Sequence, residues 1–146
     1  MELIVKELDQ MTSTEFFEVA QERVKVFIVE QNCPYQEIDE DDRIAKHVML
    51  KKEGQLVAYT RIMEREDVVT FGRVLVVKDY RNQELGKKIV ALTLAEINGL
   101  ETHKDIKISA QNYLVDFYQA FGFNVVSDVY LEDDIPHIDM LLKANV

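Results

Sequence analysis

Apolar and polar positions along the first third of the chain predict a strand and then a helix. Residues 3–8 form a short apolar stretch of strand character, and residues 16–30 carry apolar side chains at helical spacing. Thr12 and Glu15 have the spacing of a capping box, in which a hydroxyl and a glutamate satisfy the first amides of a helix. Residues 36–43 are almost all charged or amide-bearing, so we expect a solvated loop there.

Three apolar runs with short polar turns between them come next. Residues 47–51, 56–63 and 68–77 have strand character, and Gly54 and the charged stretch 64–67 separate them. Turns this short join neighbouring strands as hairpins. The middle of the chain is therefore expected to form antiparallel strands.

The apolar spacing then changes to that of a helix and back to that of a strand. Residues 85–97 have apolar positions on more than one side, which is typical of a helix packed on a sheet. Gly99 is well placed to end this helix. Residues 106–110 form a compact strand, so the segment from 74 to 110 predicts a β–α–β crossover, parallel and right-handed.

The end of the chain predicts one more helix and two more strands. We expect Asn112 to be the N-cap of a helix over 113–120, which Gly122 ends. Residues 124–131 and 137–143 have strand character. The complete order predicts an α/β fold with a mixed sheet that is mainly antiparallel.

Length and composition place the chain among ordinary globular proteins. Its 146 residues contain no linker or repeat, so residues 1–146 are expected to form a single domain. Apolar residues make up 47% and charged residues 30% of the chain. A lone cysteine, Cys33, allows no internal disulfide and favours a reducing, cytoplasmic compartment. No apolar run approaches the ~20 residues of a membrane span, so no membrane association is expected.

Net charge narrows the classes of partner. A formal charge of −10 argues against nucleic-acid binding, which needs clustered lysine and arginine. An acidic surface could attract amines, although many cytoplasmic proteins are simply acidic. The three histidines are isolated, so we expect no metal.

The bend between residues 78 and 86 is the first candidate for chemistry. It joins the end of a predicted strand to the start of a predicted helix, where unpaired backbone N–H groups can hold a diphosphate. Arg81 and Lys87 add positive charge, whereas Glu84 has the wrong sign. A plain strand–helix loop with solvated lysines and arginines fits the same spacing.

The residues at this bend resemble a known family. The run VLVVKDYRNQELG, residues 74–86, resembles the acetyl-coenzyme A signature of the GNAT superfamily of N-acetyltransferases. That signature is Arg or Gln, two residues, Gly, any residue, then Gly or Ala. Arg81 and Gly86 match the outer positions, and Glu84 departs from the glycine that is usual in the family.

Two further parts of the chain strengthen the resemblance. AQNYLVDFYQAFGF, residues 110–123, resembles the next motif of the family, in which a helix tyrosine precedes Gly-Phe. VFIVEQNCPYQEID, residues 26–39, and EDDIPHIDM, residues 132–140, are similar to segments of the ElaA-like subgroup. Together the motifs cover nearly the whole chain.

The resemblance implies a fold, a cosubstrate and a reaction. The fold would be of the GNAT type, with a central pair of strands that splay apart. The reaction would transfer an acetyl group directly from acetyl-coenzyme A (acetyl-CoA) to a primary amine, with no metal. A small amine, a polyamine or a protein lysine would each suit an acidic surface, and exposed edge strands could pair two copies into a homodimer.

The resemblance also implies which residues hold the cosubstrate. Backbone groups of the splayed strand would pair with the pantetheine arm, one N–H would polarise the thioester carbonyl, and the bend would hold the diphosphate. The residues expected to bind the cofactor are Val74, Leu75, Val76, Arg81, Asn82, Gln83, Glu84, Leu85, Gly86, Lys87 and Asn112.

Tyr118 is the predicted catalytic residue. A phenol there could donate a proton to the departing coenzyme A thiolate, whose free thiol pKa is about 8.5. The alternative is that Tyr118 is a core residue with its hydroxyl at the surface. Glu30, Gln31 and His137 are the predicted substrate contacts, with helix-end or structural roles as the alternatives.

The sequence leaves the identity of the general base open. An acceptor ammonium has a pKa near 10 and must lose a proton before it attacks. The candidates, acting directly or through water, are Glu30, Glu37, Asp39, His47 and His137.

Glu84 favours a second interpretation. A carboxylate near phosphates is repulsive, so we expect Glu84 to weaken cofactor binding without abolishing it, and to be tolerated if the loop is helical rather than at positive φ. A domain that binds acyl-coenzyme A or a protein partner without turnover would also explain it. The intact Tyr118 counts against that alternative.

Overall fold

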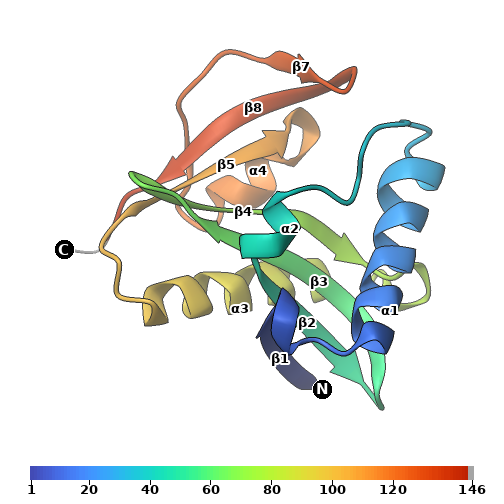
Figure 1. Ribbon diagram of the computed structural model, residues 1–146. Helices are drawn as coiled ribbons and strands as arrows, with labels where there is room; N and C mark the ends of the chain where they lie inside the picture. Colours follow the sequence, from blue (N-terminus) through green and yellow to red (C-terminus); the bar gives the residue numbers. More distant parts are fainter. Residues whose placement is uncertain (145–146) are drawn as a thin grey trace.

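Eight strands form one sheet in the computed structural model, which describes residues 1–144 (Figure 1). The strands are β1 (Glu2–Glu7), β2 (Lys46–Lys52), β3 (Gln55–Glu64), β4 (Val68–Val76), β5 (Asp105–Gln111), β6 (Asn124–Val125), β7 (Tyr130–Glu132) and β8 (Ile135–Leu142). Their order is β1-β2-β3-β4-β5-β8-β6, and β7 also pairs with β8. Only β4 and β5 are parallel among the pairs within residues 1–144, which confirms the predicted mixed sheet.

The helices connect and cover these strands. They are α1 (Ser13–Arg23), the π-helical η2 (Val24–Glu30), α2 (Asp41–Ile44), α3 (Leu85–Gly99) and α4 (Val115–Gln119), with 3-10 turns η1 (Leu8–Gln10), η3 (Lys78–Tyr80) and η4 (Asn112–Leu114). The capping box of α1 is confirmed, because the Glu15 amide donates to Thr12 Oγ1 at 3.0 Å and the Thr12 amide to Glu15 Oε1 at 2.9 Å. Across residues 1–144, no helix has the length and apolar composition that a bilayer crossing requires.

Helices pack on both faces of the sheet. α3 and α4 lie on one face, where Val48 and Ile89 belong to the larger apolar core. α1 and η2 lie on the other face, where Met49 and Tyr59 pack with Val19. Since neighbouring residues of a strand point to opposite faces, burial on both faces explains the nearly continuous apolar runs of the central strands.

The two parallel strands separate soon after they pair. Only Val68 and Val69 of β4 pair with β5, although both strands continue well beyond that point. β4 and β5 converge on the left of Figure 1 and diverge toward the right. The register between β3 and β4 shifts before Arg61, and Arg73 stands there in the left-handed region at φ 50. A bulge of this kind bends its strand, so it accounts for the predicted splay.

The prediction of a solvated loop at residues 36–43 is wrong. Glu37 is 4% and Asp42 2% exposed, and the segment ends in the short helix α2. The carboxylates point inward because arginines of α1, β3 and β4 provide partners there. A run of charges shows that polar partners are needed, but not that water provides them.

Two predictions for the end of the chain are also wrong. Asn112 does not cap α4, because it opens the turn η4 and the N-cap position falls on Leu114, without a side-chain hydrogen bond. The expected strand at 124–131 is divided into β6 and β7. The residues between β6 and β7 leave the sheet. There the Asp139 amide donates to the side-chain Oγ of Ser127 at 2.9 Å, in place of a backbone hydrogen bond between strands.

Candidate active site

A cleft of about 540 Å³ opens where β4 and β5 diverge. Val74 of β4 lies on one wall, and Ile108 and Ala110 of β5 lie on the other. Tyr118 of α4 and His137 of β8 also line it. Gln31 lines it as well, so the fold brings the predicted catalytic tyrosine and two of the three predicted substrate residues to the same cleft.

Tyr118 combines burial with access to the cleft. The residue is 5% exposed, and its ring packs against Phe71 and Phe123 with centroids 6.4 and 5.9 Å away. Burial raises the pKa of Tyr118 to about 12, because the apolar surroundings disfavour the phenolate. The hydroxyl consequently stays protonated at neutral pH, as a proton donor must.

The edge of β4 that faces the cleft has backbone groups without a strand partner. The Val77 amide donates to the Val57 carbonyl at 2.9 Å, so Val77 turns toward β3. Successive residues of a strand turn their polar groups to opposite edges, which directs those of Val74 and Val76 toward the cleft side. Leu75, by contrast, is 2% exposed and packs in the core beneath α1.

The bend after β4 leads into the N-terminus of α3 beside this edge. Glu84 occupies the N-cap position without a side-chain cap, so the first amides of the helix, at Leu85, Gly86 and Lys87, have no intrahelical partner. A Cβ on Gly86 would meet only Val76 Cγ2, at 3.9 Å, apart from the helix itself. The space in front of these unpaired N–H groups is therefore open, and such a helix start can bind a diphosphate.

Glu84 itself has a backbone conformation that we did not expect. Its φ of 58 places it in the left-handed region, and Asn82 of the same loop has φ 65. The condition under which we expected a side chain to be tolerated here, a helical loop rather than one at positive φ, is therefore not met. Glycine is usual in the family at this position, and the geometry gives the reason, since glycine alone adopts it without steric cost.

Arg81 is engaged by two groups of the protein. Its Nε donates to the Val76 carbonyl at 3.1 Å, and its two terminal nitrogens donate hydrogen bonds to the carboxylate of Glu30. The hydrogen bond from Arg81 lowers the pKa of Glu30. Glu30 thus lies beside the bend between β4 and α3, whereas its neighbour Gln31 lines the cleft.

His137 is held in one orientation at the far end of the cleft. Its Nδ1 lies 2.7 Å from the Ile135 carbonyl, which can only accept, so Nδ1 carries the proton in the neutral ring. Nε2 then presents a lone pair and lies 3.4 Å from Glu132 Oε2. Tyr130 stacks on the ring with the centroids 6.3 Å apart.

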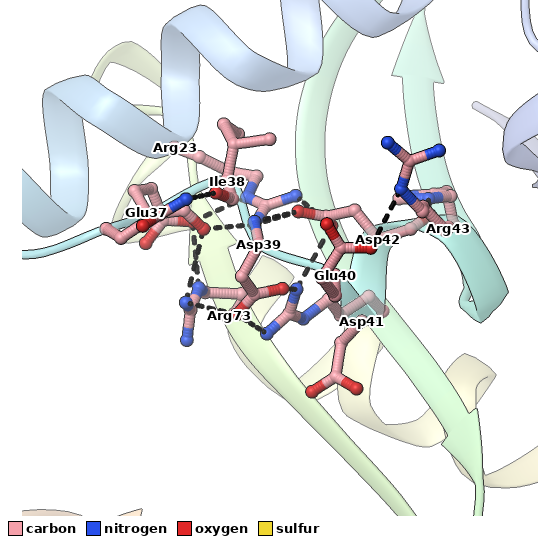
Figure 2. Close-up of polar contacts among 12 residues, drawn as sticks. Arg23, Glu37, Ile38, Asp39, Glu40, Asp41, Asp42, Arg43 and Arg73 are labelled. Atoms are coloured by element: carbon pink, nitrogen blue, oxygen red, sulfur yellow. Dashed lines mark hydrogen bonds and ion pairs between the residues drawn. The ribbon is translucent and has the colours of Figure 1, made fainter.

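A buried network of ion pairs supports the wall of the cleft (Figure 2). Arg23, fully buried, contacts Glu37 at 2.6 Å and Asp42 at 2.7 Å. Arg73 at the bulge reaches the same Glu37 carboxylate at 2.8 Å. Arg61 contacts Asp39 at 2.6 Å. The network ties the segment that follows η2 to the bulge that separates β4 from β5.

The sequence did not lead us to predict this network, although two of its features point to it. Arg61 stands alone among apolar residues of β3, and an arginine in a buried strand needs buried acids. Gly72 precedes Arg73 inside β4, and a glycine within a strand often marks a bulge.

The network also narrows the choice of a general base. Glu37 and Asp39 are bound by arginines. His47 is fully buried away from the cleft, between Tyr59 and the Asp42 carbonyl. Of the predicted bases, His137 lines the cleft with its ring free of a guanidinium partner.

The remaining predicted residues are not among those that line the cleft. Asn82, Gln83 and Lys87 are exposed on the bend and the start of α3. Asn112 follows Gln111, which lines the cleft at the end of β5. The described part of the chain holds no group of three or more His, Cys, Asp or Glu side chains that could bind a metal ion.

Comparison with known proteins agrees with this architecture. The model of the acetyltransferase (GNAT) domain family matches residues 12–144. Protein ElaA of Escherichia coli (strain K12) is 40% identical over 136 residues, which covers 90% of this chain and 89% of ElaA. The crystal structure of Escherichia coli ElaA superposes with a TM-score of 0.91 at 38% identity, covering 97% of this chain and 99% of that one.

A second solved structure is similar to the same degree. The crystal structure of an acyl-CoA N-acyltransferase from Pseudomonas aeruginosa has a TM-score of 0.92 at 38% identity and covers 98% of this chain and 99% of that one. The chain therefore belongs to the GNAT acetyltransferase family of acyltransferases and to its ElaA-like group.

Proposed function

We propose that the protein is an acetyl-CoA-dependent N-acetyltransferase that transfers the acetyl group directly to a primary amine. The observation that carries this proposal is the cleft between β4 and β5, with Tyr118 on its wall and the uncapped start of α3 at the end of β4. Membership of the family supports an acyl-CoA donor. The choice of acetyl as the acyl group and of a primary amine as the acceptor goes beyond what family membership shows.

Acetyl-CoA would supply an activated acyl thioester, and residues of this chain would position it. Polar backbone groups of the strand edge at Val74 and Val76 would pair with the pantetheine amides, and an N–H of this edge would polarise the acyl carbonyl. The bend and the first turn of α3 would hold the diphosphate through Arg81, Asn82, Gln83, Glu84, Leu85, Gly86 and Lys87. Asn112, beside the end of β5, would contact pantetheine from the opposite side.

Tyr118 would supply the proton for the leaving thiolate. The thiol of coenzyme A has a free pKa of about 8.5, well below the pKa of about 12 of Tyr118. Because the pKa of Tyr118 lies above that of the thiol, the order of the two pKa values opposes transfer of the proton to sulfur. The hydroxyl would stay protonated until negative charge builds on sulfur, and the transfer would be completed as Tyr118 recovers a proton from the attacking nitrogen.

His137 and Gln31 would serve the acceptor. The lone pair of His137 Nε2 can take a proton from the incoming ammonium, directly or through water, while Glu132 at 3.4 Å stabilises the imidazolium that forms. Gln31 lines the cleft from the end of η2 and can accept a hydrogen bond from the amine. Glu30 would act indirectly, because it competes with the diphosphate for Arg81.

Thiol release from acetyl-CoA with a panel of primary amines tests the proposal. We expect amine-dependent release together with a rise in the melting temperature on addition of coenzyme A. Glu84 at the start of α3 is the feature that favours one alternative, a domain that binds acyl-CoA without turnover. That alternative predicts the thermal shift without any thiol release above background.

A further inference from the structure

Two carboxylates stand without a cation at the acceptor end of the cleft. Glu132 and Asp133 both line it, on the hairpin that joins β7 to β8. Among residues 1–144, Glu132 has only the imidazole of His137 as an ion-pair partner, and Asp133 has no ion pair with lysine or arginine. An ammonium group placed there would meet two carboxylates that no lysine or arginine among residues 1–144 neutralises.

The cations that line the cleft are already neutralised. Arg61 is 4% exposed and is bound by Asp39 at 2.6 Å and by Asp42 at 3.1 Å. Arg73 is bound by Glu37 at 2.8 Å, and its guanidinium lies 5.3 Å from the centre of the Tyr35 ring. A carboxylate on the acceptor would find no free guanidinium in the cleft and would face the two acids of the hairpin.

The loops on either side of this end touch each other. Cys33 Sγ donates to the Asp133 carbonyl at 3.1 Å, although the two residues are far apart in the sequence. Tyr35 and Gln36, which follow Cys33, also line the cleft. The contact closes one side of the acceptor path, so the path suits a slender molecule better than a folded protein surface.

We infer that the acceptor is a slender alkyl diamine or polyamine without a carboxylate, whose second ammonium lies against Glu132 and Asp133. The inference rests on the proposed N-acetyltransferase function and specifies its substrate. One amine is deprotonated beside His137 and attacks the acyl carbon. The first proton of the ammonium goes to His137 and on to solvent. As the acyl–sulfur bond breaks, the thiolate takes a proton from Tyr118, and Tyr118 recovers one from the nitrogen that becomes the amide. The overall charge of −10 also draws polycations toward the protein.

Three commercial amines of matched length test the inference through thiol release. Cadaverine carries two amines on a five-carbon chain, pentylamine carries one, and lysine adds a carboxylate to cadaverine. We expect kcat/KM for cadaverine to exceed that for pentylamine by about fivefold or more, the size of one partly screened ion pair. Lysine should be the poorer of the two diamines. Equal kcat/KM for all three amines would overturn the inference.

A charge-neutral variant tests the position of the second ammonium. Asp133→Asn should lower the ratio of kcat/KM for cadaverine to that for pentylamine toward one. Glu2→Gln makes the same charge change on exposed β1, at the opposite edge of the sheet, and should leave the ratio unchanged. An unchanged ratio in Asp133→Asn, or an equal drop in Glu2→Gln, would contradict the inference.

Calorimetry separates this inference from the proposed function. If none of the amines releases thiol, the N-acetyltransferase proposal fails, and titration of cadaverine into the protein with coenzyme A still tests the acidic site. We expect cadaverine to bind more tightly than lysine, and Asp133→Asn to weaken it by about fivefold. Binding of lysine as tight as that of cadaverine, or no effect of the substitution, would overturn the inference.

Discussion

At the scale of single residues, the burial of Tyr118 determines its chemistry. The ring is held between Phe71 and Phe123, so the hydroxyl has a fixed place on the cleft wall. Replacement of Tyr118 by Phe should lower kcat by at least about 100-fold, the usual worth of a general acid, with little change in KM for acetyl-CoA. Tyr113→Phe is the matched control, because Tyr113 is 77% exposed. Equal kcat in the two variants would exclude Tyr118 as the acid.

The raised pKa of Tyr118 also predicts the shape of the pH profile. With a pKa of about 12, the acid stays protonated far into the alkaline range. The rate should therefore rise with pH as the acceptor, of pKa near 10, loses its proton, without a fall caused by Tyr118 below about pH 11. A falling limb near pH 9 that is absent from Tyr118→Phe would refute this assignment.

At the scale of the elements, the bend between β4 and α3 combines a favourable helix start with an unfavourable residue. Glu84 adds a left-handed backbone conformation and a negative charge at the place proposed for the diphosphate. Glu84→Gly should tighten the binding of coenzyme A, because it removes both. Glu84→Gln removes only the charge and should give a smaller gain that disappears at high salt. Calorimetric dissociation constants at low and high salt measure the two effects, and unchanged constants in both variants would contradict this explanation.

The same elements show what a sequence can and cannot predict. Periodicity was enough for the order of the main strands and helices up to α4, because that order depends on local apolar spacing, but not for α2 or for the division of 124–131 into β6 and β7. The splay was expected from the resemblance to the family. The bulge at Arg73 and the left-handed Glu84 were not foreseen, since backbone conformation at one residue is set by distant partners such as Glu37. The burial of Glu37 and Asp42 within 36–43 was missed for the same reason.

At the scale of the whole molecule, the buried ion network joins α1, the segment before β2, and the strands β3 and β4. Arg23→Met would leave Glu37 and Asp42 buried with one fewer cation, so it should cost about 3–5 kcal/mol of the free energy of unfolding. Arg65→Met removes an exposed pair with Asp41 and should cost less than about 1 kcal/mol. Urea unfolding measures both costs. Similar losses in the two variants would show that the network adds no special stability.

His47 gives the whole molecule a pH-dependent stability. Burial lowers the pKa of His47, so the unfolded chain binds its proton more readily than the folded one. The contribution is therefore fully present above the unfolded pKa of about 6.5 and is lost as the pH falls below it. The free energy of unfolding should drop between about pH 7 and about pH 5 in the wild type, and less steeply in His47→Gln. Identical slopes would rule out His47 as the cause.

The central claim is that the gap between β4 and β5 holds the acyl thioester. A crystal structure of the protein with acetyl-CoA tests this most directly. We predict that pantetheine lies along Val74 and Val76, with the diphosphate at the start of α3 and the Tyr118 hydroxyl within hydrogen-bonding distance of sulfur. The second cavity of the described chain, of about 520 Å³ beside His103 and Lys104, offers a different place. Cofactor bound there, with the gap between the strands left empty, would contradict the account.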